Sequence, residues 1–587
     1  MIKSWSLSND KAMINFSSNY CTTEGEILSS DAFKSVLEHF FKRVSNNYSK
    51  NRYLIEEFYE KDKAIDSLIS TLKLLSVMNS KELSNNFKDL SFVYENKRRF
   101  RSLIEDIYTY WRNLERYALI FESAGKNGLE HSSFIDVKSR FDKLVLTLYR
   151  KISDNISMTT PKVHRQVRAG SNVGLVLKNI IWPIPEDYRV LSSIPFIVDV
   201  VLESPFITYP KRNTRSGFFE ETTINPIIRA SINSDDFLAY PILVGDLLCY
   251  AFCHRDFMTH LISLSNLFEM ASVSDIAGKK PDLMVIFGYE DENSPCDIFY
   301  DDVENDMIVG YISNDKKYDY FGYMKKMILT LHNIKQMQRN NLPIHGSMIN
   351  LELNDSKKAN IVIMGDSGAG KSESIEALRS LSEENLRDMT IIFDDMGDFR
   401  INPAGGKPLA YGTETGAFVR LDDLDQGFAF KQLDRSIFMN PDKTNARLIN
   451  PVSDYSEIMA GSSVDVFLYA NNYDEVSDYD SSIEQFKNAS EAKEVFKAGM
   501  RQAKGTTSEK GLTKSYFANP FGPYQKQDLC DKLIDKYFDE LFDKNVYVGE
   551  LKTQLGIRGK EKTGPRKAAL ELFELIRELN EKKYSLK

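Results

Sequence analysis

Apolar residues recur at helical spacing through the first 155 residues, as in the series Leu68, Leu72, Leu75 and the series Tyr108, Trp111, Leu114, Tyr117. Residues that break helices are scarce in this stretch, because the first of the 18 prolines is Pro161 and only three of the 30 glycines precede it. A segment with so few breakers can support long helices. The pattern therefore predicts an all-helical region over residues 1–155.

The pattern changes after Pro161. Short apolar and β-branched runs appear, for example over residues 195–201 and 281–288, and turn residues bound them, so they predict strands. From residue 344 onward, predicted strands and helices alternate, which is typical of mixed α/β proteins. We therefore expect three parts, namely the helical region 1–155, a strand-containing domain over 156–343 and an α/β domain over 344–587.

The composition excludes several classes of protein. The 75 basic residues are outnumbered by 84 acidic ones, which argues against a generally basic coat for nucleic acid. No apolar run approaches the roughly 20 residues that span a bilayer, and the N-terminus lacks the apolar core of a signal peptide. The five cysteines are scattered and odd in number, which argues against a disulfide framework. We expect a cytoplasmic protein with neither nucleic acid nor membrane as a partner.

The sharpest motif follows an apolar run at residues 360–364 and precedes a predicted helix at 374–381. It matches the pattern G-x-x-x-x-G-K-[ST] and consists of Gly365, Asp366, Ser367, Gly368, Ala369, Gly370, Lys371 and Ser372. Its glycines let backbone N–H groups curl around phosphate oxygens at a helix N-terminus, where the helix field favours anions. Lys371 can reach the β- and γ-phosphates of a nucleotide, and the Ser372 hydroxyl can ligate a divalent cation. We therefore predict a nucleotide-binding loop.

A second apolar run, residues 389–393, ends in the paired carboxylates Asp394 and Asp395. By itself, such a pair is more often a turn or a cap. A strand that ends in carboxylates beside a phosphate-binding loop is, however, the usual place for a metal ligand or a general base. We therefore expect Asp394 and Asp395 to belong to the same site as the loop.

Two further motifs lie upstream of the loop, where residues 320–327 read Y-F-G-Y-M-K-K-M and residues 344–347 read I-H-G-S. In this order and at similar spacing, the chain resembles the ATP-dependent phosphoenolpyruvate carboxykinases. Their motifs read Y-x-G-x-M-K-K-G, M-H-C-S-A-N, G-x-S-G-x-G-K-T and I-G-D-D-E-H-G-W. Downstream, residues 445–451, 496–522 and 558–567 resemble further family segments, so the resemblance covers roughly residues 280–587.

The resemblance implies a mixed-sheet, phosphate-loop nucleotide-binding core. A substrate-side domain would occupy 156–343, and a nucleotide-binding domain 344–587, with a lid at about 496–522. It also implies decarboxylation and phosphorylation of oxaloacetate to phosphoenolpyruvate, with ATP, Mn²⁺ and Mg²⁺. The implied metal ligands are Lys326, His345, Asp395 and, for a second cation, Ser372. The implied catalytic residues are Lys325, Lys326, Lys371, Asp394, Asp395 and Arg447, and further substrate or nucleotide contacts are Arg215, Tyr320 and Arg558.

Some positions depart from the carboxykinase pattern. Ser372-Glu373 after the loop lysine and the dipeptide His345-Gly346 look more like the HPr kinase/phosphorylases, a related fold that phosphorylates a serine of a protein. The segment around Arg215 keeps only Arg-Ser of the family's substrate motif. Lys326 favours the carboxykinase, because the HPr kinases have no equivalent lysine.

Two alternatives therefore stay open. The first is a kinase that acts on a protein or small-molecule hydroxyl, with Asp394 or Asp395 as the general base. The second is a non-catalytic nucleotide-binding switch whose helical region 1–155 binds a protein partner.

Overall fold

The structure is a computed structural model that describes residues 4–17, 20–46, 63–121, 129–158, 170–290, 296–366, 368–381, 386–421, 435–477, 479–503 and 511–585. The chain packs as two compact units. Unit 1 comprises Met1–Asn179 and Pro195–Ser204, and unit 2 comprises Ile180–Ile194 and Pro205–Lys587. Both units combine helices with strands, so the predicted α/β class is confirmed. The finer division into three parts stays a prediction.

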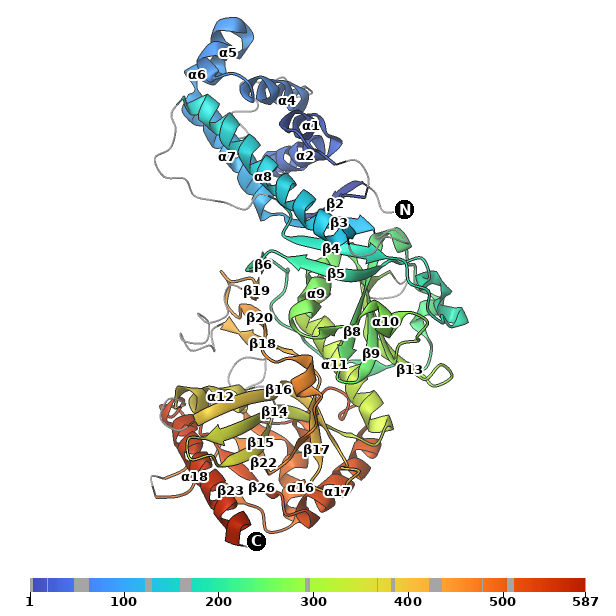
Figure 1. The fold of residues 1–587 in the computed structure, drawn as a ribbon, viewed down its shortest axis with the longest axis vertical. Helices are drawn as coiled ribbons and strands as arrows, with labels where there is room; N and C mark the ends of the chain where they lie inside the picture. The colour runs from blue at the N-terminus through green and yellow to red at the C-terminus, as the bar shows by residue number, and fades with distance from the viewer. Residues whose placement is uncertain are drawn as a thin grey trace. The chain divides into compact units, whose positions relative to one another are not determined.

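Unit 1 contains a sheet whose neighbouring strands are β1 (Trp5–Ser8), β2 (Lys11–Asn15), β3 (Glu115–Phe121), β4 (Val173–Lys178) and β5 (Phe196–Leu202). The pairs β2–β3 and β3–β4 are parallel, and β1 and β5 run antiparallel to their neighbours. The helices, coloured blue to cyan in Figure 1, are α1 (Glu24–Ser29), α2 (Asp31–Asn46), α4 (Ala64–Leu75), α5 (Ser80–Asn86), α6 (Ser91–Glu95), α7 (Lys97–Asn113) and α8 (Leu129–Ser157).

The prediction of an all-helical region over residues 1–155 is not confirmed, because β1, β2 and β3 lie within it. Tyr117 continues the helical spacing of Tyr108 and Leu114, yet it lies in β3. The buried guanidinium of Arg116 donates to the backbone oxygens of Trp111, Arg112 and Leu114 at 2.6–2.7 Å. These bonds satisfy carbonyls at the end of α7 and fix the point where the helix stops.

The first part of unit 2 contains a mixed sheet. Its neighbouring strands are β8 (Phe237–Val244), β9 (Leu247–His254), β11 (Leu283–Tyr289), β13 (Met307–Ser313), β12 (Asp297–Asp302) and β7 (Glu220–Glu221), and β10 (Glu269–Met270) pairs with β8. Its helices are α9 (Met258–Ser263), α10 (Val273–Ile276) and α11 (Phe321–Gln338). Helix α11 packs against β11 and β13 of this sheet and against β14 of the next one. Helix α11 is almost entirely buried, and its side chains lie between the two sheets.

The second sheet of unit 2 has the strand order β21-β17-β16-β14-β15-β22-β26-β23. The bounds are β14 (Leu342–Leu353), β15 (Lys358–Met364), β16 (Leu386–Arg400), β17 (Leu409–Gly412), β21 (Ser462–Ser463), β22 (Val466–Asn471), β23 (Ile483–Gln485) and β26 (Tyr547–Lys552). The small sheets are β18 (Gly416–Arg420), β20 (Arg447–Pro451), β19 (Ile437–Met439) and β6 (Phe206–Thr208), and the hairpin β24 (Met500–Gln502) with β25 (Leu512–Lys514).

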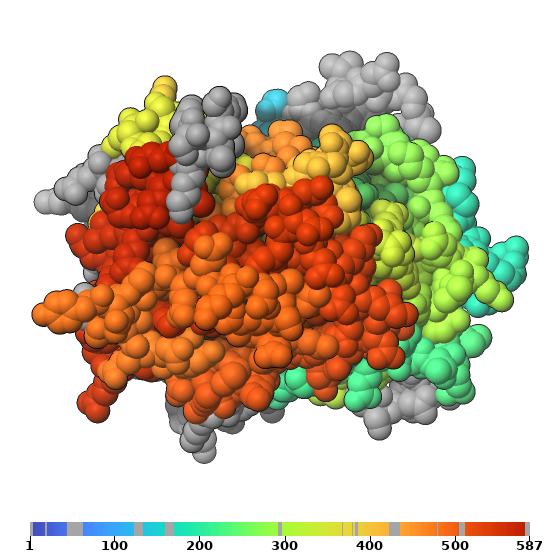
Figure 2. Space-filling view, turned by 90° about the horizontal axis from the view of Figure 1, so that it is seen from below, coloured from blue at the N-terminus to red at the C-terminus, as the bar shows by residue number. Residues whose placement is uncertain are grey.

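Strand β22 shows how helices cover both faces of this sheet. Val466 and Leu468 pack in a core with α12 (Lys371–Ser380) and α18 (Thr563–Ser585). The intervening Phe467 meets Phe496 of α16 (Ala489–Ala498) and Phe538 of α17 (Gln527–Asp543) instead. Such a strand is buried on both faces, as its continuous apolar run requires. In the space-filling view of Figure 2, C-terminal segments coloured orange to red form much of the visible surface. The short helix α15 (Tyr455–Ile458) precedes β21.

No helix among the described residues is long and apolar enough to cross a membrane.

Candidate functional site

Three elements of unit 2 bring the predicted site residues together. Strand β14 pairs antiparallel with β16, which sets Gly346 opposite Asp395 and Ser347 opposite Asp394. Asp395 has a φ of 140°, a conformation that a residue with a Cβ rarely adopts. Such a conformation persists only where its surroundings hold it. Here the surroundings are four cationic or imidazole side chains that contact the Asp395 carboxylate.

The Asp395 carboxylate is the centre of the site. Its Oδ2 lies 2.7 Å from Nζ of Lys325 and 2.7 Å from Nζ of Lys326, both on α11. Its Oδ1 lies 3.0 Å from Nε2 of His345 on β14 and 4.0 Å from Nζ of Lys371. Burial alone would raise the pKa of Asp395, but Lys325 and Lys326 hold it well below its usual range. The Asp395 carboxylate, on β16, therefore contacts side chains from α11, β14 and the start of α12.

The two adjacent lysines differ in their protonation. Burial opposes the charge of Lys325, but Asp395 and the buried Glu414, 3.0 Å away, raise its pKa above the usual value. Burial lowers the pKa of Lys326 to about 8, and the charge of Lys325 adds to this effect. Burial raises the pKa of Glu414 to about 7, although Lys325 opposes the shift. Near neutral pH, Lys325 is thus a fixed cation, whereas Lys326 can lose its proton.

The hydrogen bonds of His345 leave one nitrogen facing the Asp395 carboxylate. Nδ1 lies 2.6 Å from the backbone oxygen of Ala518, which can only accept, so Nδ1 carries a proton. In the neutral ring, the lone pair of Nε2 then faces the Asp395 oxygen. Two acceptors at 3.0 Å repel each other unless a proton or a metal ion lies between them. Burial lowers the pKa of His345, and Lys371 lowers it further, which disfavours the proton.

The donor set of Lys326, His345 and Asp395 fits a divalent transition metal. An amine that loses its proton near pH 8, an unprotonated imidazole nitrogen and a carboxylate converge here. Among the described residues, no three His, Cys, Asp or Glu side chains form a metal-binding group, so the fit depends on the lysine. The side chain of Ser372, the predicted ligand of a second cation, lies outside the described atoms.

The predicted phosphate loop connects β15 to α12. Gly368 and Gly370 have φ values of 80° and 110°, and a Cβ on Gly370 would lie 2.8 Å from Oγ1 of Thr553. Glycine is therefore required at position 370. Nζ of Lys371 donates to the backbone oxygen of Gly365 at 2.7 Å. Ser367, which we also predicted to be part of the loop, lies outside the described residues.

Aromatic rings and arginines line the predicted substrate side. The Arg215 guanidinium lies over the rings of Phe219 and Phe521, at 5.0 and 5.3 Å from their centroids. Lys326 approaches the same Phe521 ring at 4.5 Å, and Arg447 lies 5.3 Å from the ring centroid of Phe418. Lys325 also faces the Phe418 ring, at 5.6 Å. Phe521 thus lies between Arg215 and Lys326, and Phe418 lies between Arg447 and Lys325.

Tyr320 and the loop that carries Arg215 share an anchor. Burial raises the pKa of the Tyr320 hydroxyl, although Arg447 and Lys325 nearby oppose the shift. Asp319, directly before Tyr320, accepts from the backbone N–H of Lys211 through its carboxylate and from that of Arg212 through its own backbone oxygen. The position of the loop is thus tied to the start of α11.

Other predicted residues stand apart from this cluster. Asp394 accepts a hydrogen bond of 2.7 Å from the Ser347 hydroxyl, on the neighbouring strand. Arg558 is exposed, in the segment that reaches the phosphate loop through Thr553. In the predicted lid, residues 496–503 and 511–522 are described and their Phe517 and Asn519 are buried, whereas 504–510 lie outside the described residues.

Sequence reasoning missed several residues of the site. Glu414 and Phe418 carry no motif of their own, and Glu414 is marked only by its place in the polar run Thr413–Thr415 between two glycines. Ser347 ends the I-H-G-S motif, but the sequence assigned it no role. Phe521 lies in a segment that we predicted as lid, and its contact with Lys326 follows from the fold alone.

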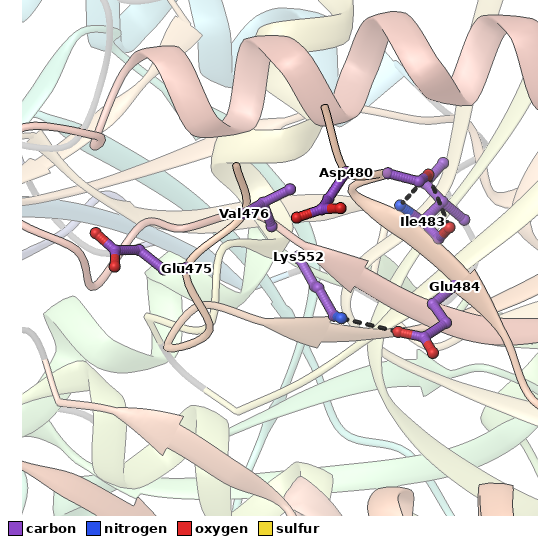
Figure 3. Close-up of a pocket in the computed structure, with 7 residues that line it drawn as sticks. Glu475, Val476, Asp480, Ile483, Glu484 and Lys552 are labelled. Atoms are coloured by element: carbon purple, nitrogen blue, oxygen red, sulfur yellow. Dashed lines mark hydrogen bonds and ion pairs between the residues drawn. The ribbon is translucent and has the colours of Figure 1, made fainter. Parts of the chain in front are cut away.

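A cavity of about 310 Å³ lies elsewhere in unit 2, beside the end of β26 (Figure 3). Glu475, Asp480, Glu484 and Lys552 line it, and Lys552 is paired with Glu484 at 2.8 Å. None of the predicted site residues lines this cavity.

The sequence matched no protein-family model and no curated protein with which it was compared.

Proposed function

We propose that this chain is an ATP-dependent phosphoryl-transfer enzyme of the carboxykinase type, which converts oxaloacetate and ATP into phosphoenolpyruvate, CO₂ and ADP. One observation carries the proposal. A single carboxylate, Asp395, contacts the predicted metal-ligating lysine and histidine and lies 4.0 Å from the lysine of the predicted phosphate loop. The nucleotide and the acceptor would therefore both bind next to the Asp395 carboxylate. Such an arrangement suits direct transfer of a phosphoryl group between two bound substrates.

Both steps of this reaction concentrate negative charge on small oxygens. Loss of CO₂ breaks the bond between C3 and C4 of oxaloacetate, and the electron pair forms an enolate. The enolate oxygen then takes the γ-phosphoryl group as its bond to ADP breaks. Fixed cations in a site shielded from water are what such charge requires. Lys325, which keeps its proton, and Arg447 supply positive charge on the acceptor side, and Lys371 supplies it on the nucleotide side.

Arg215 and Tyr320 would hold the carboxylate end of the substrate, since both stand beside the lysine pair. Lys326, His345 and Asp395 would hold Mn²⁺, and Ser372 would ligate Mg²⁺ with the nucleotide. When bound, Mn²⁺ acts as a Lewis acid toward substrate oxygens. The buried residues of segment 511–522, among them Phe517 and Asn519, would limit the access of water.

A second candidate, phosphorylation of a hydroxyl on a protein, is favoured by one observation. Phe218 and Tyr524 stack at a centroid distance of 4.8 Å next to the Arg215 loop, although they are 52% and 43% exposed. An exposed aromatic pair at this place suits contact with a protein. The low pKa of Asp395 argues against this candidate, because it makes Asp395 a weak general base.

A coupled assay tests both candidates. The purified chain receives ATP, Mn²⁺ and oxaloacetate, and parallel samples omit oxaloacetate or Mn²⁺. The carboxykinase predicts that phosphoenolpyruvate forms only when all three are present. ATP turnover without oxaloacetate, and with no phosphoenolpyruvate, would favour the kinase. Failure to bind ATP would refute both.

The remaining predictions concern the cell and a partner. All five cysteines are free thiols, which suits the reducing cytoplasm we propose. Residues 1–155 would supply the surface for a protein partner, whether the chain is an enzyme or a nucleotide-binding switch. A partner that co-purifies with the wild-type chain, but not with a variant whose surface residues in 1–155 are replaced, would support that role.

A further inference from the structure

A buried ion pair connects the predicted phosphate loop to the hairpin formed by β24 and β25. Nε of Arg501, on β24, lies 3.1 Å from Oδ2 of Asp366, the second residue of the loop. Arg501 is 4% and Asp366 is 6% exposed. Removing one partner of a buried pair is strongly unfavourable, because the remaining charge stays uncompensated. This ion pair therefore holds the phosphate loop and the hairpin together.

Asn472, directly after β22, makes a second connection between the same two segments. Its Nδ2 donates to the backbone oxygens of Gly368 and Gln502, each at 3.0 Å. Its Oδ1 accepts from the backbone N–H of Gln502 at 2.8 Å. Tyr469, within β22, donates from its hydroxyl to the backbone oxygen of Met500 at 2.7 Å. The position of β24 is thus fixed relative to the loop by side chains on both sides of Arg501.

The charge at position 366 needs a permanent counter-ion if the loop binds nucleotide. In the described part of the chain, Asp366 faces Arg501, Lys371 and His345, whose Nδ1 lies 3.7 Å from Oδ1, and its charge also acts on the Tyr469 hydroxyl. Nδ1 of His345 already donates to Ala518, and Lys371 would be engaged by the phosphates. Among the described cations, Arg501 is the one that forms a close ion pair with Asp366, at 3.1 Å. Without it, a buried carboxylate would face the negative phosphates.

We propose that Arg501 is a positioning residue of the nucleotide site, which neutralises Asp366 and makes hairpin β24–β25 a fixed part of the phosphate loop. This inference rests on the proposed nucleotide site. It also goes beyond it, because it gives the hairpin a role in ATP affinity and explains how an acidic residue is tolerated inside a phosphate-binding loop.

The two partners should respond to substitution with opposite signs. Arg501→Gln leaves Asp366 without its counter-ion, so ATP affinity should fall by about tenfold or more. Asp366→Asn removes the repulsive charge and should leave ATP affinity equal or higher. The double variant Asp366→Asn/Arg501→Gln should recover most of the loss, because neither charge remains. A purely structural bond would instead weaken ATP binding in both single variants, and the double variant would not recover.

Titration calorimetry with ATP and Mg²⁺ on the full chain measures these affinities, and thermal unfolding without nucleotide shows whether each variant folds. Arg501→Lys, which keeps the charge, should bind ATP within about threefold of wild type. The matched control is Arg189→Gln, whose pair with Glu186 at 2.6 Å is exposed on the surface and should not matter. If wild type fails to bind ATP, the proposed function is wrong. If wild type binds ATP and Arg501→Gln binds it equally well, or the double variant binds no better than Arg501→Gln, this inference alone is wrong.

Discussion

Mn²⁺ binding should rise with pH through the ionisation of Lys326. A lysine ligates a metal only as the neutral amine, and burial lowers the pKa of Lys326 to about 8. At pH 8 about half of the amine is neutral, whereas at pH 6 only about 1% is neutral. The apparent affinity for Mn²⁺ should therefore be about fifty times weaker at pH 6 than at pH 8. The other two ligands add little, because the pKa of His345 is lowered and Asp395 stays ionised.

Titration calorimetry without nucleotide at pH 6, 7 and 8 gives this dependence directly. Repeating the titration at pH 7 in buffers of different ionisation enthalpy counts the released protons. About 0.9 proton should leave per bound ion, since about nine tenths of the amine is protonated one unit below its pKa. Lys326→Met should bind Mn²⁺ weakly and without this pH dependence. The control Lys316→Met removes an exposed lysine just before α11 and should behave as wild type.

Two results would refute the reasoning. Affinity that changes by less than about threefold between pH 6 and 8 would show that Lys326 is not a ligand in its neutral form. A Lys326→Met variant that keeps the full pH dependence would assign the titration to another group.

Three further predictions follow from single residues. Lys371→Ala should abolish nucleotide-dependent turnover while circular dichroism and thermal unfolding stay close to wild type, because the loss is several kcal/mol of transition-state stabilisation; turnover within a few-fold of wild type would contradict the loop assignment. Asp319→Ala should raise the KM for oxaloacetate and leave the KM for ATP unchanged, since it removes the carboxylate that accepts from the backbone N–H of Lys211 in the loop that carries Arg215; equal effects on both would indicate a general loss of structure. Arg116→Met should lower the stability of unit 1 by at least about 3 kcal/mol, measured by urea unfolding, because several buried carbonyls lose their donor; an unchanged unfolding midpoint would contradict this account.

The phosphate loop shows what the sequence can predict. The predicted strand 360–364 and helix 374–381 correspond to β15, which ends at Met364, and to α12, which begins at Lys371. Both the glycine pattern and the apolar run are local, so neighbouring residues determine them. The expected proximity of Asp395 to Lys371 agrees with the 4.0 Å distance between them, because β16 and β15 both pair with β14.

Contacts between distant segments explain what the sequence could not predict. Glu414 follows β17 and reaches Lys325 because β17 pairs with β16, against which α11 also packs. Nothing in its own sequence neighbourhood marks this residue as buried. Likewise, the end of α7 depends on the guanidinium of Arg116, and the helical apolar spacing continues through that point into β3. In both cases, a tertiary contact overrides a pattern that is locally consistent.

Contacts between distant segments also determine the protonation states of the two adjacent lysines. Lys325 and Lys326 are neighbours about 100° apart on the helix, and the sequence gives no reason to assign them different protonation states. In the fold, both reach the same oxygen of Asp395, but only Lys325 also reaches Glu414. Burial and the charge of Lys325 lower the pKa of Lys326, so its proton is the one that leaves. A permanent cation and a potential metal ligand therefore arise from two identical residues, and the difference between them depends on Glu414.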